Sequence, residues 1–199
     1  MKALRSFIII LCLPIFLLAQ EESNYKTIAL SFNFNGLNLS TYYGGVGGRL
    51  WISESTVLNA SIGGSISERE SLESEEIDNG LEKNKYLILG IGMENHFPVT
   101  EDLSPYLSTR LSFGYSDQYY RYYNSSNEYQ DVIYSYYLGI GLGVEYWIFD
   151  RISLSGQHLF NAYYEAGHRN TNGSATIVQE IKGYGLAFGT TSLMLSIYF

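Results

Sequence analysis

The chain has 199 residues, which suits a single domain, and a formal net charge of −8. Charged residues make up 16% of the sequence, and the mean hydropathy is −0.05. The negative balance argues against a nucleic-acid partner, because phosphate binding requires a basic surface. Beyond the N-terminus, no apolar run is long enough for a membrane helix.

The N-terminal segment has the pattern of a secretory signal. Lys2 and Arg5 precede an apolar run over residues 7–18, and the small residue Ala19 is followed by Gln20. A basic start, a short apolar run and a small residue are what a signal peptidase substrate requires. We therefore expect cleavage after Ala19 or Gln20.

Cleavage there divides the chain into a signal peptide over residues 1–20 and an exported domain over residues 21–199. The signal carries two cations and no acidic residue, so its removal changes the formal charge from −8 to −10. It also removes Cys12, the one cysteine. An exported domain without disulfides needs another stabilising framework, and a closed ladder of backbone hydrogen bonds would serve.

The exported domain repeats a pattern in which apolar residues alternate with small or polar ones. A period of two residues is that of a β-strand with one apolar face. Eight such strands are predicted, over residues 27–35, 42–52, 57–67, 85–97, 104–115, 133–148, 152–165 and 190–199. The seventh is less regular, and its Leu159-Phe160 pair suggests a β-bulge.

The composition of the second strand face identifies the apolar face as the one that meets lipid. In a soluble lipocalin-like barrel, the outer face would carry many Lys, Glu and Thr residues. Here the second face is mostly Gly and Ser, as in Gly139, Gly141 and Gly143. Small residues fit the crowded interior of a narrow barrel. The predicted fold is all-β: a membrane-spanning, eight-stranded, antiparallel up-and-down β-barrel.

The strands and the terminal Ile197-Tyr198-Phe199 resemble the small outer-membrane barrels of the OmpA transmembrane-domain and OmpX type. In that family the C-terminal Phe, with apolar residues at alternate preceding positions, is read by the barrel assembly machinery. Leu193, Leu195, Ile197 and Phe199 match that assembly signal. The resemblance implies a bacterial outer-membrane protein surrounded by lipid and lipopolysaccharide.

Short and long connections alternate between the predicted strands. The long ones cover residues 68–83, 116–131 and 166–189. For residues 166–189 the sequence leaves two conformations open: an extension of the last hairpin above the membrane, or a segment folded over the barrel mouth. An even strand number puts both termini beside the short turns, which in bacterial outer-membrane barrels face the periplasm, so the long loops are extracellular. Aromatic residues end the strands that enter the short turns and are expected to form an inner interfacial girdle; they are Trp51, His96, Phe97, Trp147 and Phe149.

Four charged residues lie on the predicted inner face: Arg49, Glu94, Arg110 and Glu145. Isolated charges there would be costly, so we expect them to pair in an ion network that plugs the barrel. The resemblance implies the same, because its small barrels fill their lumen with such networks. The alternative is that these residues line a narrow pore for small solutes. His96 is expected to join the network rather than to bind a metal.

Two of the long segments have distinctive compositions. The first is acidic and is interpreted as a solvated loop, with Glu70, Glu73, Glu75, Glu76 and Asp78 as candidate cation ligands. The second is rich in Tyr, which favours contact surfaces. Its candidate contact residues for an unidentified surface partner are Tyr119, Tyr120, Arg121, Tyr122, Tyr123 and Tyr129. Tyr115, Tyr134, Tyr136 and Tyr137 at its base are expected to form an outer girdle.

These features predict a non-enzymatic barrel that serves envelope integrity or surface contact, with no cofactor and no metal. The family's neighbourhood includes lipid A deacylases that use a His-x-Ser-Asn stretch. Here the nearest stretch is His158-Leu159-Phe160-Asn161, with Phe160 at the position of the nucleophilic Ser. Without that hydroxyl, acyl transfer has no nucleophile. A lipid A-modifying enzyme is therefore the least favoured of the three functions.

Overall fold

A computed structural model describes residues 28–35, 45–71, 80–122, 128–172 and 176–199. They form one antiparallel barrel in which each strand pairs with the next and β8 closes on β1. The strands are β1 (Ile28–Asn35), β2 (Gly45–Trp51), β3 (Thr56–Ser71), β4 (Gly80–His96), β5 (Leu103–Tyr122), β6 (Glu128–Phe149), β7 (Ile152–Asn172) and β8 (Ile177–Tyr198). The predicted eight-stranded up-and-down barrel is confirmed.

Some predictions fall on residues that the structure does not describe. The signal peptide with Ala19 and Gln20 is one of them, and Tyr123 is another. Four of the candidate cation ligands also lie outside the described residues: Glu73, Glu75, Glu76 and Asp78. Within the described ranges, no helix is long and apolar enough to cross a membrane.

The two strand faces have the predicted chemistry. Outward side chains are large and apolar, and they remain open to the surroundings, as in Ile91 (61% exposed), Leu111 (54%) and Ile140 (61%). Inward side chains are small or polar and largely covered, as in Ser108 and Ser153. Because an apolar outer surface of this kind is stable only against hydrocarbon, the barrel is one that spans a membrane.

The strands are much longer than predicted, which corrects the loops over residues 68–83 and 116–131. Of the two conformations left open for residues 166–189, the described residues adopt the extended hairpin. β5 and β6 remain paired up to Arg121 opposite Glu128, and β7 and β8 up to Thr171 opposite Ile177. β3 likewise reaches Ser71, so Glu70 lies in a strand rather than a loop. In β3 to β7, the segments farthest from the short turns (the upper segments) carry mostly polar or aromatic side chains on both faces. This removes the alternation that revealed the segments near the short turns (the lower segments).

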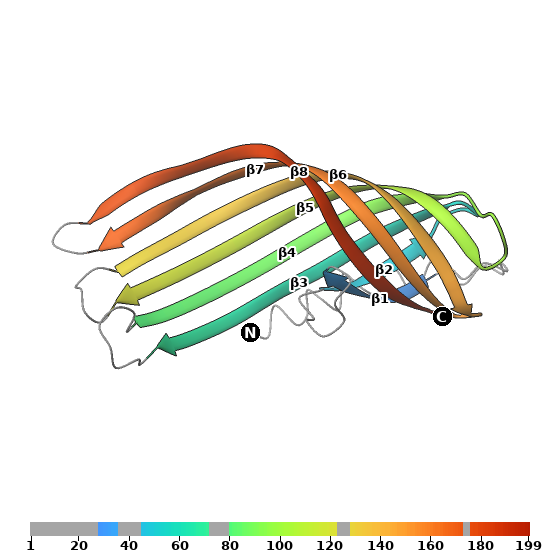
Figure 1. Cartoon of the computed structure of the whole chain (residues 1–199), viewed down its shortest axis with the longest axis horizontal. Helices are drawn as coiled ribbons and strands as arrows, with labels where there is room; N and C mark the ends of the chain where they lie inside the picture. The colour runs from blue at the N-terminus through green and yellow to red at the C-terminus, as the bar shows by residue number, and fades with distance from the viewer. Residues whose placement is uncertain (1–27, 36–44, 72–79, 123–127, 173–175) are drawn as a thin grey trace.

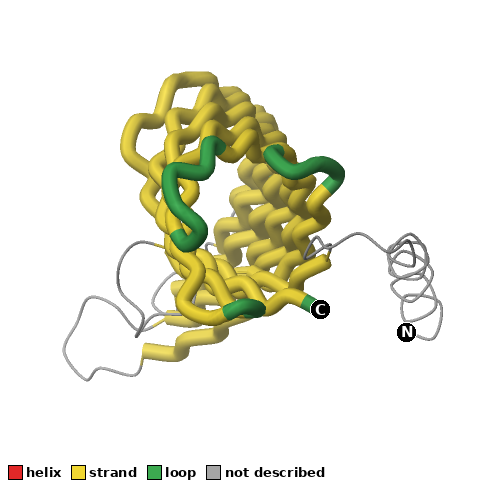
Figure 2. Tube along the Cα trace, turned by 90° about the vertical axis from the view of Figure 1, so that its right-hand side faces the viewer, coloured by secondary structure: helices red, strands yellow, loops and turns green. Residues whose placement is uncertain are grey.

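Beyond the closed ring, the longer strands continue as an open sheet, which extends to the left in Figure 1 and is called the upper sheet. β1 and β2 have 8 and 7 residues, whereas β3 to β8 have between 16 and 22. The ring therefore closes only where β1 and β2 are present, and the six longer strands continue past it. Viewed along the barrel, they curve around the lumen as one sheet (Figure 2).

A bulge in β8 lets both of its halves point their apolar side chains outward. Leu193 and Leu195 have odd numbers, whereas Leu186 and Phe188 have even numbers, so a regular strand would put the two pairs on opposite faces. The pairing with β7 shifts by one residue between Leu159 and Phe160, and the added residue is Gly189. Its φ of 97° lies in the left-handed region that glycine adopts most easily. The irregularity predicted in β7 is thus at the right level but in the partner strand.

The inner girdle is corrected for the tryptophans. Trp51 contacts His96, with ring centroids 4.8 Å apart, and Trp147 contacts Tyr198 at 4.6 Å. His96 and Tyr198 are buried inside the barrel, so both indoles line the lumen. Of the residues predicted for the girdle, Phe97 and Phe149 remain exposed. His96 and Phe97 are adjacent, and a period-two strand presents adjacent residues to opposite sides. Phe149 differs from Trp147 because the pairing of β6 with β7 shifts between these two residues.

Candidate functional site

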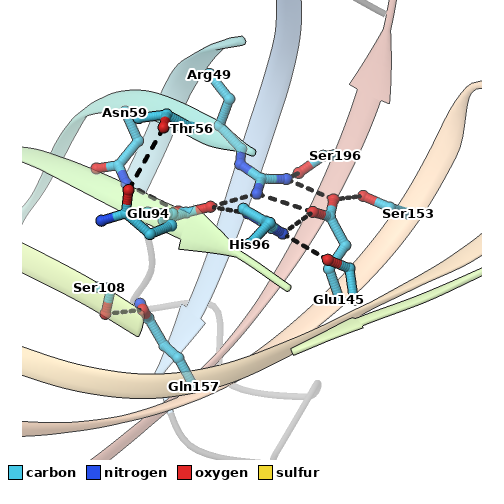
Figure 3. A network of polar contacts seen from close by, with 12 residues as sticks. Arg49, Thr56, Asn59, Glu94, His96, Ser108, Glu145, Ser153, Gln157 and Ser196 are labelled. Carbon is cyan, nitrogen blue, oxygen red and sulfur yellow. Dashed lines mark hydrogen bonds and ion pairs between the residues drawn. The ribbon is translucent and has the colours of Figure 1, made fainter. Parts of the chain in front are cut away.

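Arg49 is the centre of a buried polar plug at the lower end of the barrel (Figure 3). It projects inward from β2. Its Nη1 donates to Glu145 Oε1 at 2.6 Å, and its Nη2 donates to Glu145 Oε2 at 3.0 Å. Nη2 also donates to Glu94 Oε2. One guanidinium from β2 thereby joins carboxylates from β4 and β6 across the lumen, with all three side chains nearly inaccessible to solvent.

The Glu94 side of the plug includes His96 and Asn59. Asn59 Nδ2 donates to Glu94 Oε1 at 2.8 Å. His96 Nε2 contacts Glu94 Oε2 at 3.2 Å, and His96 Nδ1 contacts Ser104 Oγ at 3.1 Å. The two carboxylate oxygens of Glu94 therefore both have hydrogen-bond partners. The geometry places His96 in the network, as expected.

The Glu145 side of the plug is completed by residues from β7 and β8. Tyr198 OH accepts a hydrogen bond from Arg49 Nη1 at 2.6 Å and donates one to Glu145 Oε1 at 3.1 Å. Ser153 also donates to Glu145, and Ser196 accepts from Arg49 at 3.2 Å. Tyr198, Ser153 and Ser196 were not among the predicted site residues. Their positions on the small-residue face of their strands were the signal that could have identified them.

Arg110, the fourth predicted member, lies apart from the plug. Its Nη2 donates to Ser61 Oγ at 2.6 Å and its Nε donates to Ser112 Oγ at 3.2 Å. Within the described part of the chain, no carboxylate oxygen lies within 4.0 Å of its guanidinium. The expectation that all four charged residues form one network is therefore wrong for Arg110. Sequence position gave its inward face but not its distance from the carboxylates.

An aromatic layer packs against the plug, and glycines make room for it. The rings of His96 and Tyr106 have centroids 4.8 Å apart. Gly143 of β6 lies opposite Tyr106, and a Cβ at position 143 would be 2.2 Å from Tyr106 Cζ. The alternating glycines of β6 are therefore the small partners of large inward side chains. This large-to-small complementarity leaves little free volume in the lumen.

The structure separates the tyrosines of the upper sheet by face. Tyr115, Tyr134 and Tyr136 belong to a chain of ring contacts on the outer side that also includes Phe113. Tyr137 instead faces inward with Tyr163, their centroids 6.2 Å apart, so its place in the outer girdle is corrected. The period of two puts it on the opposite face from Tyr136.

The predicted loop-contact residues lie in strands at the top of the sheet. Tyr119, Tyr120, Arg121 and Tyr122 end β5, and Tyr129 is near the start of β6. Tyr120 is paired with Tyr129, and Arg121 Nε lies 3.5 Å from Glu128 Oε1. These residues therefore form part of a hydrogen-bonded rim rather than a free loop.

An ion pair between the half-exposed Arg169 and the buried Asp131 lies in the upper sheet. Arg169 donates to both oxygens of Asp131, from Nε at 2.7 Å and from Nη2 at 2.5 Å. The hydrogen bonds and the negative charge of Asp131 raise the pKa of the Arg169 guanidinium. Charged pairs at this height are compatible with water or lipid headgroups, not with hydrocarbon.

The residues considered for lipid A chemistry do not form a catalytic arrangement. His158 Nδ1 contacts Thr191 Oγ1 at 3.0 Å, and the Phe160 ring packs edge-on against the imidazole at 5.1 Å. Phe160 itself is exposed on the outer face. Over the described ranges, no group of three His, Cys, Asp or Glu residues is arranged to hold a metal ion.

No protein-family model matches the sequence, and no curated protein matches it. Among solved structures, a major outer membrane protein from Thermus thermophilus is similar, with 12% identity and a TM-score of 0.51 over 86% of this chain and 98% of that one. Ail, the attachment invasion locus protein of Yersinia pestis, has 16% identity and a TM-score of 0.38 over 86% and 92% of the two chains. CarO of Acinetobacter baumannii has 7% identity and a TM-score of 0.39 over 86% and 96%.

At these identities the likeness concerns the fold alone. The Thermus protein, a major outer membrane protein, matches this chain over nearly its whole length. The chain therefore has the fold of the small outer-membrane β-barrel proteins, as the resemblance in its sequence implied.

Proposed function

We propose that this chain is a non-enzymatic protein of the bacterial outer membrane, in which a plugged barrel carries a tall sheet to a contact surface outside the cell. The observation that carries the proposal is the height of the strands. A transmembrane β-strand needs roughly 9–11 residues. β6 and β8 each have 22 residues, about twice that number.

The chemistry of the strands changes along their length in support of this division. Near the short turns, the outer face is apolar, as at Leu142 and Leu154. Further up, charged pairs stand on the sheet: Lys85 Nζ lies 3.6 Å from Asp117 Oδ2, and Lys182 Nζ lies 2.7 Å from Glu180 Oε1. Charged side chains facing hydrocarbon would be costly, so the upper segments belong outside it.

The orientation follows from the closed end of the barrel. Phe199 N donates to Ile28 O at 3.0 Å, so the C-terminus lies beside the start of β1 and on the side of the short turns. We assign this side to the periplasm and the tall sheet to the exterior. Leu193, Leu195 and Ile197 face outward in β8, where the assembly machinery could read them together with Phe199.

The plug supports a closed rather than a conducting barrel. The side chains of Arg49, Glu94 and Glu145 are at most 2% exposed, which supports a lumen that is closed at their level. The test is single-channel conductance of the refolded, signal-free barrel in a planar bilayer. No steady openings are expected. Reproducible openings whose size changes in Glu145→Gln would instead show a narrow pore for small solutes.

The contact surface is tested by shortening the sheet without breaking its register. Gln118 is paired with Asp131, so replacing residues 119–130 with an Asn-Gly turn keeps that pair opposed. The matched control replaces residues 68–83 in the same way, because Ser67 is paired with Asn84. The control hairpin has no Tyr in the removed segment.

Attachment of whole cells to protein-coated and uncoated surfaces is the readout, with equal surface expression confirmed for each variant. We expect the loss of residues 119–130 to reduce attachment and the control to leave it largely unchanged. Equal attachment by the parent, the 119–130 variant and the 68–83 control would exclude surface contact through this rim. Envelope integrity would then be the one proposed role that remains.

A further inference from the structure

Arg110 is a lumenal cation whose hydrogen bonds all go to neutral hydroxyls. Arg49 donates to two carboxylates, whereas Arg110 donates to Ser61 and Ser112. Buried cations are normally matched by an anion, because their desolvation is otherwise uncompensated. Among the described residues, Arg110 has no ion pair that would compensate its desolvation, so a bound anion is the group that could do so.

The Arg110 guanidinium lies over a row of three small residues. Ser61, Gly90 and Ser112 are register partners across β3, β4 and β5. Arg110 comes from the same strand as Ser112, two residues below it, and its side chain lies over Gly90. A Cβ at position 90 would be 2.7 Å from Arg110 Nη2 and 2.9 Å from Nε. The absence of a side chain at Gly90 is what allows this placement.

This row of small residues, together with Arg110, presents more hydrogen-bond donors than acceptors. Ser61 and Ser112 each accept a hydrogen bond from Arg110, which leaves their own hydroxyl hydrogens available to donate. The Nη1 group of Arg110 has two further hydrogens, and no residue in the described ranges accepts from it. Donors converging on a positive charge are the arrangement that binds an anion.

A small polar cavity of about 10 Å³ adjoins Arg110 and Ser61, with Asn59, Ser108 and Gln157 also among its lining residues. That is room for one particle of the size of a water molecule. Glu94 reaches the same cavity, but Asn59 donates to its Oε1, and Arg49 donates to its Oε2. The carboxylate is thus held toward the plug, and the Arg110 side of the cavity remains rich in donors.

We propose that the barrel binds one small inorganic anion, of the size of chloride, between the Arg110 guanidinium and the hydroxyl of Ser61. The site stands above the plug and goes beyond the proposed surface function, which does not depend on it. Its size excludes carboxylate sugars and phosphate esters. Binding neutralises a charge that the plug residues, engaged with one another, do not contact.

The test is a salt titration of the ¹⁵N-labelled barrel, refolded with its full exported chain in non-ionic micelles. Sodium chloride is compared with sodium gluconate at matched ionic strength and fixed pH. We expect the amide shifts of Ser61, Gly90 and Ser112 to move saturably with chloride but not with gluconate. Linear movement in both salts would mean that the site holds water alone and would overturn the proposal.

Two variants make the assignment specific. Arg110→Gln should abolish the saturable response, whereas Arg151→Gln, which removes the same charge from the turn between β6 and β7, should retain it. Gly90→Ala keeps the charge but displaces the guanidinium, so it should bind chloride more weakly than the parent. Heat-modifiable gel mobility checks that each variant is folded. A response that persists unchanged in Gly90→Ala and in Arg110→Gln would contradict the proposed site.

Discussion

Two arginine–carboxylate pairs of the same chemistry stand at opposite ends of this molecule. Arg49 donates two hydrogen bonds to Glu145, and Arg169 donates two to Asp131. The lower pair is 0% exposed on both sides, whereas the upper pair is 48% and 11% exposed. Burial decides how much stability is lost when one partner of such a pair is removed: the loss is large for a buried pair and small for an exposed one.

The comparison separates two regions with different sources of stability. In the lower ring, all eight strands close around a polar plug, and removing one charge leaves the others unpaired in a low dielectric. In the upper sheet, six strands continue as a ladder of backbone hydrogen bonds, and most of their charged side chains are partly or largely exposed. The lower region should therefore be sensitive to single substitutions, and the upper region should tolerate them.

The largest expected effect is that of Arg49→Leu. It leaves Glu94 and Glu145 buried without their cation, and the loss of one partner of a buried ion pair costs about 3–5 kcal/mol. Urea unfolding of the refolded barrel in micelles would measure it. The matched change, Arg169→Leu, should lower the unfolding free energy much less, because Arg169 is half-exposed and water can reach this pair.

A compensating variant tests the reason for that loss. If the penalty comes from uncompensated charge, Arg49→Leu combined with Glu94→Gln and Glu145→Gln should recover most of the stability. If the triple variant is as unstable as Arg49→Leu alone, the arginine acts through packing, and the comparison of the two pairs fails.

The second effect concerns the glycines that face the lumen. In Gly143→Ala the new Cβ would be 2.2 Å from a ring atom of buried Tyr106, and overpacking of this kind costs about 1–3 kcal/mol. Gly156→Ala is the control, because its Cβ would be 3.6 Å from Leu193 Cδ2. Denaturant midpoints should fall for the first and change little for the second. Equal midpoints would mean that the lumen is less closely packed than the structure shows.

A smaller effect is expected where the lower ring joins the upper sheet. Gly189 has a φ of 97°, and an L-residue in the left-handed region costs roughly 1–2 kcal/mol. Gly189→Ala should therefore lower the unfolding free energy, and Gly189→Asn should lower it less, because Asn tolerates this conformation better. If the two variants are equally stable, backbone strain at the bulge is not what glycine relieves.

The sequence was most informative where one strand face meets lipid and the other meets the lumen. Leu138, Ile140 and Leu142 alternate with glycines because hydrocarbon and a narrow interior impose opposite requirements on successive residues. Strand number, order and facing could therefore be predicted. Above the membrane neither requirement applies, so the extensions of β3 to β6 were interpreted as loops, and the extension of β7 and β8 was left open.

The plug was only partly predictable for a related reason. Alternation gives the direction of Arg49, Glu94, Glu145 and Arg110, but it does not give their heights in the lumen. Height depends on the stagger between strands: Arg49 is paired with Asn59, and Glu94 is paired with Val57 two positions away. Arg110 is paired with Gly92, which is the partner of Asn59, so the backbones of Arg49 and Arg110 are in register with each other. Glu145, however, is paired with Ser104, well below Arg110 along β5, and the Arg110 side chain donates to Ser61 and Ser112 on the side away from Glu145. The direction of the side chain along the lumen, which the sequence does not give, separates Arg110 from the plug.

The smallest expected effect is in the upper sheet, at Lys182. Its Nζ lies 2.7 Å from Glu180 Oε1, on the same face of β8, and this hydrogen bond raises the pKa of the ammonium group. A raised pKa means that the pair's contribution is complete below the pKa of the unfolded chain and is lost as pH rises through the folded one. Between neutral pH and mildly alkaline pH, it should therefore be constant.

NMR titration of the Lys182 side chain should show a higher pKa in the parent barrel than in Glu180→Gln. Since both side chains are mostly exposed, the global unfolding free energy should be the same in the two proteins. A pKa difference without a stability difference is what an ion pair in water produces. If Glu180→Gln instead destabilises the barrel as Arg49→Leu does, the upper sheet is not the solvated ladder that the comparison requires.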